Sequence, residues 1–164
     1  MQLGLEEPSA EQDDAFHAAW VEEMLTAAVE LLLKECHQKG HGDRFRVLYG
    51  RLCEGLTARQ VAEALGLSLS QSENGYKQAV AGLRGCLERL VREHVERYSA
   101  GSTPEEEFQF EWGRLNEHLH RHGGLEQAVR LAYEGLDKEY GPERKLSSVR
   151  STQIRLKEGA PPSG

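Results

Sequence analysis

The segment over residues 57–90, TARQVAEALGLSLSQSENGYKQAVAGLRGCLERL, has the pattern of a helix-turn-helix that continues into a long helix. Thr57 and Gln60 have the spacing of a capping box, and Gly66 suits the left-handed conformation that ends a helix. The helix between them has an apolar face formed by Val61, Ala62 and Leu65. Two helices joined by a short, glycine-containing turn are the arrangement that places a recognition helix in the major groove of DNA.

Helical periodicity extends over most of the 164-residue chain, and alternating runs suited to strands are nearly absent. We therefore expect one all-α domain, a helical bundle that contains the helix-turn-helix and carries extra C-terminal helices. No apolar run approaches the roughly 18 residues of a membrane span, and the acidic N-terminus lacks the pattern of a signal peptide. A cytoplasmic location without membrane contact is expected.

Capping signals and glycines predict that the chain is divided into four parts. Residues 1–8 are expected to be a flexible N-terminus, and residues 9–122 a helical domain whose first helix is capped by Ser9 and ends near Cys36. The later elements of that domain are a short helix over 45–52, the helix-turn-helix, a long helix from near 72 to 98, and a helix capped by Thr103. Residues 123–142 would add one more helix, and residues 143–164 a basic, partly disordered tail.

Two features describe the surface of the long helix. Opposite charges at i,i+4 spacing predict the ion pairs Glu88–Arg92, Arg89–Glu93 and Glu93–Arg97. Three glycines, at positions 75, 82 and 85, lie roughly on one side, and each costs on the order of 1 kcal/mol relative to alanine. They indicate either a poor helix or a smooth face that admits another helix closely, as a protein-binding surface would.

Few residues have side chains and spacings suited to catalysis or metal binding. Cys36, Cys53 and Cys86 are too widely spaced for a metal knuckle and are expected to be buried, reduced thiols. His118 and His122 are one helical turn apart, but no further ligand has suitable spacing, so incidental surface histidines are favoured over a metal site. Without a phosphate loop, a nucleophile elbow or paired carboxylates, we expect no enzyme activity, no cofactor and no small-molecule substrate.

The net charge of −7 is opposite in sign to that of most compact nucleic-acid binders, so DNA binding requires basic residues gathered on one face. The basic segment 144–157 would contact phosphates or an acidic partner, or else be a solvated linker. Phe108 and Trp112 lie near a glutamate-rich run, where core packing is favoured over an amphipathic docking helix.

From residue 16 to about residue 119 the chain resembles extracytoplasmic-function-type RNA polymerase sigma factors, particularly a planctomycete-type group. The resemblance rests on FHAAWVEEMLTAAVELLLKECHQKG, on RFRVLYGRL with ARQVAEALGLS, and on LERLVREHVERYSAGSTPEEEFQFEWGRL. It covers region 4 of that family, so residues 9–122 would be a sigma-region-4-like domain. The resemblance implies binding to a promoter element and to RNA polymerase.

Three departures separate the chain from that family. No counterpart of the promoter-melting region 2 is visible. The segment YKQAVAGLRGCLERL keeps Lys77 and Arg84 but has glycine or cysteine at three family arginines, which would remove about three phosphate contacts. The alignment also requires about four extra residues after Gly66, an added helical turn that would shift the recognition helix.

Two hypotheses follow. In the first, the protein is transcription-associated and binds DNA, RNA polymerase or both, with residues 72–90 as recognition helix. The residues predicted to face DNA are Arg59, Gln71, Ser72, Asn74, Lys77, Gln78, Ala81 and Arg84. Amides read adenine edges, and cations read guanine or hold phosphates. In the second hypothesis, a degenerate sigma-like fold has lost its DNA contacts and is a protein–protein interaction module for another regulatory protein.

Overall fold

The computed structural model describes residues 10–98 and 103–135, and this part of the chain contains six α-helices and no strand. They are α1 (Ala10–Gln38), α2 (Gly42–Leu52), α3 (Ala58–Leu65), α4 (Leu69–Tyr98), α5 (Pro104–His122) and α6 (Leu125–Glu134). The predicted all-α fold is therefore confirmed. None of these six helices is both long and apolar enough to cross a membrane.

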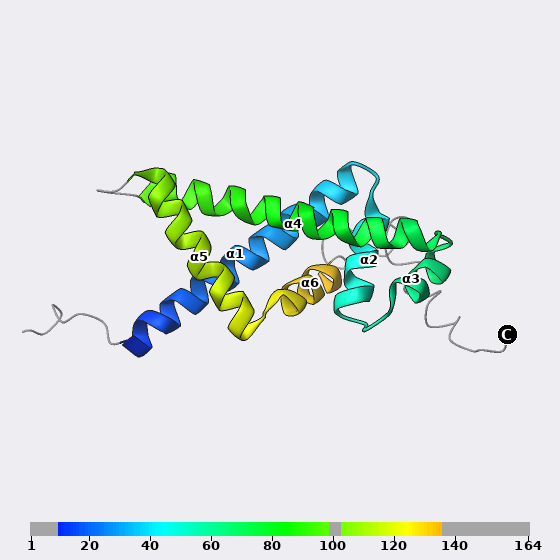
Figure 1. Ribbon diagram of the computed structural model, residues 1–164, viewed down its shortest axis with the longest axis horizontal. Helices are drawn as coiled ribbons and strands as arrows, with labels where there is room; N and C mark the ends of the chain where they lie inside the picture. The colour runs from blue at the N-terminus through cyan, green and yellow to red at the C-terminus, as the bar shows by residue number, and fades with distance from the viewer. Residues whose placement is uncertain (1–9, 99–102, 136–164) are drawn as a thin grey trace, which may run out of the picture.

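The two long helices α1 and α4 cross each other and organise the bundle (Figure 1). At one end, α2 and α3 pack against the first half of α4, and at the other end α5 packs against its second half. The core residues of α1 recur at helical spacing, which gives this helix one continuous buried side: Val21, Leu25, Ala28, Val29, Leu32 and Cys36. Helix α6 contributes Val129 and Tyr133 to the same core.

Glycines on α4 allow the helices of the bundle to approach closely. A Cβ atom at Gly82 would lie 3.0 Å from Leu32 Cδ1 of α1, and one at Gly75 would lie 3.7 Å from Val47 Cγ2 of α2. At Gly85 a Cβ atom would meet nothing within 4 Å. Of the two interpretations of these glycines, close helix approach holds for Gly82, but the helix that it admits is α1 of the same chain and not a partner.

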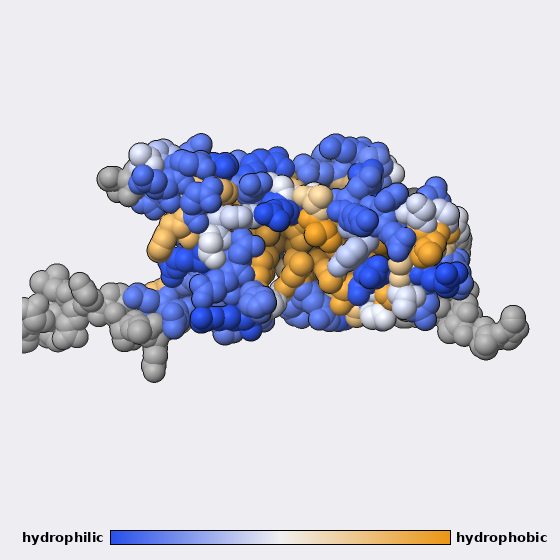
Figure 2. All heavy atoms as spheres, in the orientation of Figure 1, coloured by the Kyte–Doolittle hydropathy of each residue, from blue (hydrophilic) through white to orange (hydrophobic). Residues whose placement is uncertain are grey.

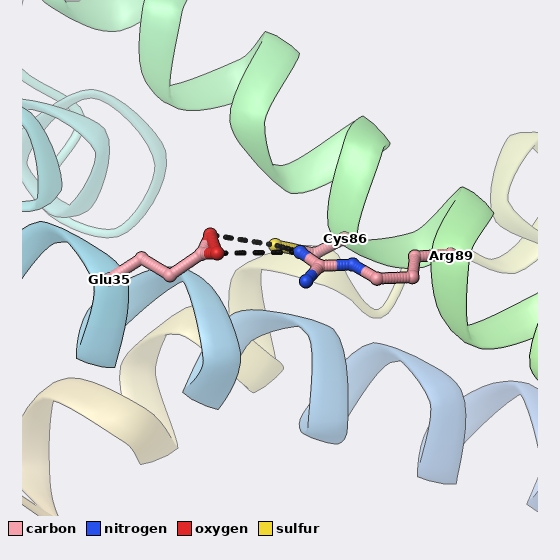
Figure 3. Close-up of polar contacts among 3 residues, drawn as sticks. All are labelled: Glu35, Cys86 and Arg89. Atoms are coloured by element: carbon pink, nitrogen blue, oxygen red, sulfur yellow. Dashed lines mark hydrogen bonds and ion pairs between the residues drawn. The ribbon is translucent and has the colours of Figure 1, made fainter.

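A polar cluster joins α1 to α4 beside this crossing (Figure 3). Arg89 Nη2 donates to Glu35 Oε2 at 3.3 Å, and Cys86 Sγ donates to Glu35 Oε1 at 3.6 Å. Further along α4, Arg92 Nη1 lies 3.1 Å from Glu105 Oε2 of α5. The predicted pairs Arg89–Glu93 and Glu88–Arg92 are therefore wrong, because both arginines bond to carboxylates that neighbouring helices bring close to them.

The side chain of Arg46 on α2 is fully buried. Its Nη1 lies 2.6 Å from Oε1 of Glu54, in the loop between α2 and α3. The guanidinium also lies 5.3 Å from the ring centroid of Tyr49 and 5.8 Å from that of Tyr133 on α6. These two rings stack with centroids 4.0 Å apart, so the cluster ties α2, the following loop and α6 together.

The start of α5 and the break between α5 and α6 agree with the sequence signals. The Thr103 side chain accepts a hydrogen bond from the Glu106 backbone N–H at the start of α5, and Gly123 and Gly124 separate α5 from α6. Helix α6 ends at Glu134. The predicted cap at Ser9, the flexible N-terminus over 1–8, the continuation of the last helix to 142 and the basic tail over 143–164 lie outside the described residues.

Two glycines one turn apart on α4 offer a matched test of the packing. We expect Gly85→Ala to raise the free energy of unfolding by up to about 1 kcal/mol, because alanine favours the helix and the site is open. Gly82→Ala should raise the free energy of unfolding by less than Gly85→Ala, or should lower it, because the side chain of Leu32 must move. Urea denaturation of both variants measures the difference, and equal gains would contradict the close α1–α4 contact.

Candidate nucleic-acid interface

Two consecutive N-terminal caps fix where the two helices of the helix-turn-helix begin. The predicted capping box at α3 is confirmed, since the Thr57 side chain accepts from Gln60 N–H and the Gln60 side chain accepts from Thr57 N–H. Gly66 ends α3 with a φ of 71°. A second reciprocal cap then opens α4: Gln71 N–H donates to Ser68 Oγ at 3.0 Å, and Ser68 N–H donates to Gln71 Oε1 at 2.8 Å.

These caps leave only residues 66–68 between α3 and α4, which is the short turn typical of helix-turn-helix proteins. The extra helical turn expected after Gly66, relative to the sigma family, stays a prediction. Helix α4 begins at Leu69, three residues before the expected start at Ser72.

Ser72 is the one predicted DNA-facing residue that the structure contradicts. Its side chain is fully buried, and Oγ donates a hydrogen bond to the Ala58 carbonyl at 2.8 Å. Position 72 lies about two helical turns before the buried Ala79, so it falls on the packed side of α4, where it contacts α3. Ser72 therefore holds the two helices together and is not available to DNA.

The other predicted residues are exposed: Arg59 on α3, and Gln71, Asn74, Lys77, Gln78, Ala81 and Arg84 on α4. On α4 they lie on the side opposite the buried positions Ala79 and Leu83, and exposed Ser70, which the sequence interpretation missed, shares that side. Two members have other contacts as well. Gln71 Oε1 accepts the Ser68 cap bond, and the Arg84 guanidinium lies 5.8 Å from the Trp112 ring on α5.

Charge is distributed unevenly along the chain. Residues 1–33 contain eight carboxylates and no lysine or arginine, whereas residues 34–85 contain eight cationic side chains and five carboxylates. The acidic part includes most of α1, whose first residues lie at the opposite end of the molecule from α3 (Figure 1). The exposed face of α4 bears Lys77 and Arg84, with Glu73 at its border. The segment that contains the helix-turn-helix thus has a formal charge of +3 (eight cations less five carboxylates), within a chain whose net charge is −7.

A groove of about 340 Å³ borders this face. One wall is formed by Gln71, Asn74 and Gln78 of α4, and the other includes His41 and Arg44 from the start of α2. The sequence interpretation did not connect His41 and Arg44 with the recognition helix. The clustered HGDR motif of residues 41–44 is a local signal of polarity, but its position beside α4 depends on tertiary packing.

The cysteines do not form a reactive centre. All three are free, and Cys36 and Cys86 are buried as predicted, whereas Cys53 is half-buried. Burial raises the pKa of Cys86, and the nearby Glu35 carboxylate raises it further, so this thiol stays protonated at neutral pH. Burial likewise raises the pKa of Cys53 to about 11. A nucleophilic cysteine needs the opposite shift.

Histidines form a second cluster, between the start of α1 and the end of α5. The ring of His118 lies 5.8 Å from that of His17 and 4.7 Å from that of His122, beside a cavity of about 700 Å³. The described residues include no group of three side chains placed to hold a metal ion. Burial lowers the pKa of His118, and the neighbouring His122 and His17 lower it further. On the same helix Phe108 is buried, which confirms its predicted core packing.

Known proteins give no guide to the function of this chain. No model of a protein family matches this chain, and no curated protein or solved structure is significantly similar to it. Seven of the eight residues predicted from sequence are exposed on α3 and α4, and three of them, Gln71, Asn74 and Gln78, line one groove with His41 and Arg44.

Ser72 and Ser70 provide a test of this arrangement. Ser72→Ala should lower the free energy of unfolding by about 1 kcal/mol, because a buried hydrogen bond to Ala58 is lost. Ser70→Ala, at an exposed position, should change stability by less than about 0.5 kcal/mol. Denaturation in urea gives both values, and a neutral Ser72→Ala variant would contradict the buried contact.

The histidine cluster predicts a pH dependence of stability. Because the folded-state pKa of His118 lies below its ordinary value of 6.5, the unfolded chain binds more protons in this range. Stability should therefore fall as the pH drops from about 7.5 to about 5.5. His118→Gln should flatten this dependence, measured as the urea midpoint, more than His120→Gln at an exposed position. Equal pH profiles for the two variants would contradict the assignment.

Proposed function

We propose that this protein binds duplex DNA through α3 and α4, in a transcription-associated role. The observation that carries the proposal is a helix-turn-helix with a three-residue turn, whose exposed face of amides and cations belongs to the positively charged part of an acidic chain. The width of the major groove admits one α-helix, and α4 offers a row of exposed polar side chains for it.

Each exposed side chain has a role suited to its chemistry. Asn74 and Gln78 carry amides that can pair with adenine edges, and Lys77 can pair with guanine or a phosphate. Ala81 is small enough to let the helix approach a thymine methyl group. Arg59, at the start of α3, and Arg84, at the edge beside Trp112, are assigned to phosphates.

The resemblance to sigma region 4 supports RNA polymerase or another regulatory protein as a second partner. A cytoplasmic location accompanies this role. No enzymatic activity, cofactor or small-molecule substrate forms part of the proposal.

A second candidate function is a protein–protein interaction module. Figure 2 shows apolar side chains gathered between α4 and α6, on a face that is otherwise mainly hydrophilic. Exposed apolar surface of this kind is a feature of interaction sites. The polar and non-acidic face of α4 favours DNA binding over this alternative.

The proposal is tested by fluorescence anisotropy of labelled random-sequence duplex DNA over a salt series. If Arg59, Lys77 and Arg84 each neutralise a phosphate, log K should fall with log salt, and these three contacts should contribute about −3 to the slope. Lys77→Gln should make that slope shallower by about one unit. Arg97→Gln removes the same charge from an exposed position near the other end of α4 and should leave the slope unchanged.

Absence of binding even at low salt would overturn the DNA proposal, and the protein-interaction candidate would then take its place. Equal losses for Lys77→Gln and Arg97→Gln would show that binding depends on overall charge and not on the face of α4.

A further inference from the structure

The turn between α1 and α2 lies directly beside the residues proposed to read DNA. It forms one wall of the groove of about 340 Å³ whose other wall contains Gln71, Asn74 and Gln78. The turn contributes Gly40 and His41 to that wall, and the first turn of α2 contributes Asp43 and Arg44. A ligand that covers the exposed face of α4 therefore also meets this turn.

The backbone of the turn is fixed by hydrogen bonds. His41 N–H donates to the Cys36 carbonyl at 2.7 Å, and Gly40 N–H donates to the His37 carbonyl at 3.3 Å. Gly40 has a φ of +74°, the left-handed conformation that glycine adopts readily, and closes α1 in this way. Arg44 N–H then donates to the His41 carbonyl at 3.0 Å as α2 begins. The turn holds its side chains on a defined backbone.

The turn also carries uncompensated positive charge. Residues 34–44 contain Lys34, Lys39 and Arg44 against Glu35 and Asp43, and the Glu35 carboxylate is already paired with Arg89. Within the described residues Lys39 and Arg44 form no ion pair. Burial raises the pKa of Cys36, but the positive charges of Arg44 and Lys39 act in the opposite direction, so both lie near the end of α1.

We propose that the α1–α2 turn is a second DNA contact, at which Arg44 and Lys39 hold phosphates of the strand that borders α4. This inference rests on the proposed DNA-binding function. A helix in the major groove, about 12 Å wide, is flanked on both sides by phosphate backbones. An element fixed beside the recognition helix on its exposed side meets one of those backbones.

The inference predicts a loss of affinity that is independent of DNA sequence. In the full chain, Arg44→Gln should weaken binding to random-sequence duplex DNA about five- to tenfold at about 0.1 M salt, and should make the salt slope shallower by about one unit. The same loss is expected on any duplex, because phosphates carry no base identity. Asp43→Asn should strengthen binding, since it removes the carboxylate of this groove. Arg97→Gln remains the matched control, and circular dichroism checks the folding of each variant.

The outcomes separate the two proposals. If the wild-type chain binds DNA with a clear salt slope but Arg44→Gln leaves affinity and slope unchanged, the second contact is overturned while the helix-turn-helix proposal stands. A loss limited to one DNA sequence would also overturn it, because it would indicate base reading and not phosphate binding. If the wild-type chain binds no duplex DNA, both proposals fail together.

Discussion

The buried ion pair between Arg46 and Glu54 controls where the helix-turn-helix sits on the bundle. A guanidinium without exposed surface needs its counter-ion, because breaking a buried pair typically costs about 3–5 kcal/mol. Glu54 follows α2 directly, so this requirement turns the chain back at the point where α3 must begin. Gly50, near the end of α2, lets α3 approach: a Cβ atom there would lie 3.2 Å from Val61 Cγ2, so α3 could not pack as closely against a larger residue.

Helix α6 belongs to the same arrangement, although it lies far from α2 and α3 in the sequence. Tyr133 stacks on Tyr49 over the buried guanidinium, and Arg130 Nη2 donates to the Cys53 carbonyl at 3.3 Å. The Cys53 thiol in turn donates to the Glu126 carbonyl at 3.4 Å. Side chains and backbone of α6 thus hydrogen-bond to the end of α2. The position of α3, which follows α2, therefore depends on a helix about sixty residues later in the chain.

Local signals made part of this structure predictable from sequence. The cap formed by Thr57 and Gln60 and the stop at Gly66 depend on neighbouring residues only, and both were found in the expected places. The Ser68–Gln71 cap is equally local, and its Ser-x-x-Gln spacing is a signal that places the start of α4 before Ser72. Ser72 lies about two helical turns before the buried Ala79, so the helical period itself places it on the packed side of α4 and not on the exposed side.

Other features could not be predicted because they depend on distant parts of the chain. Arginine is rarely buried, and Arg46 is buried only because Glu54, Tyr49 and Tyr133 converge on it. Similarly, Arg89 has a glutamate one turn away on its own helix, yet it bonds to Glu35 on α1. The groove beside α4 requires the α1–α2 turn to lie next to a helix that begins about thirty residues later.

The separation of charge along α1 has a consequence for any charged partner. A helix of 29 residues is roughly 43 Å long, whereas electrostatic fields in physiological salt decay over a screening length of about 8 Å. The carboxylates near the start of α1 are therefore several screening lengths from α3, and the two ends of the molecule act as independent charges. A polyanion would repel one end and attract the other, so its field would rotate the approaching protein before the surfaces touch. For an elongated molecule of this kind, orientation during the encounter depends on the dipole and not on the net charge.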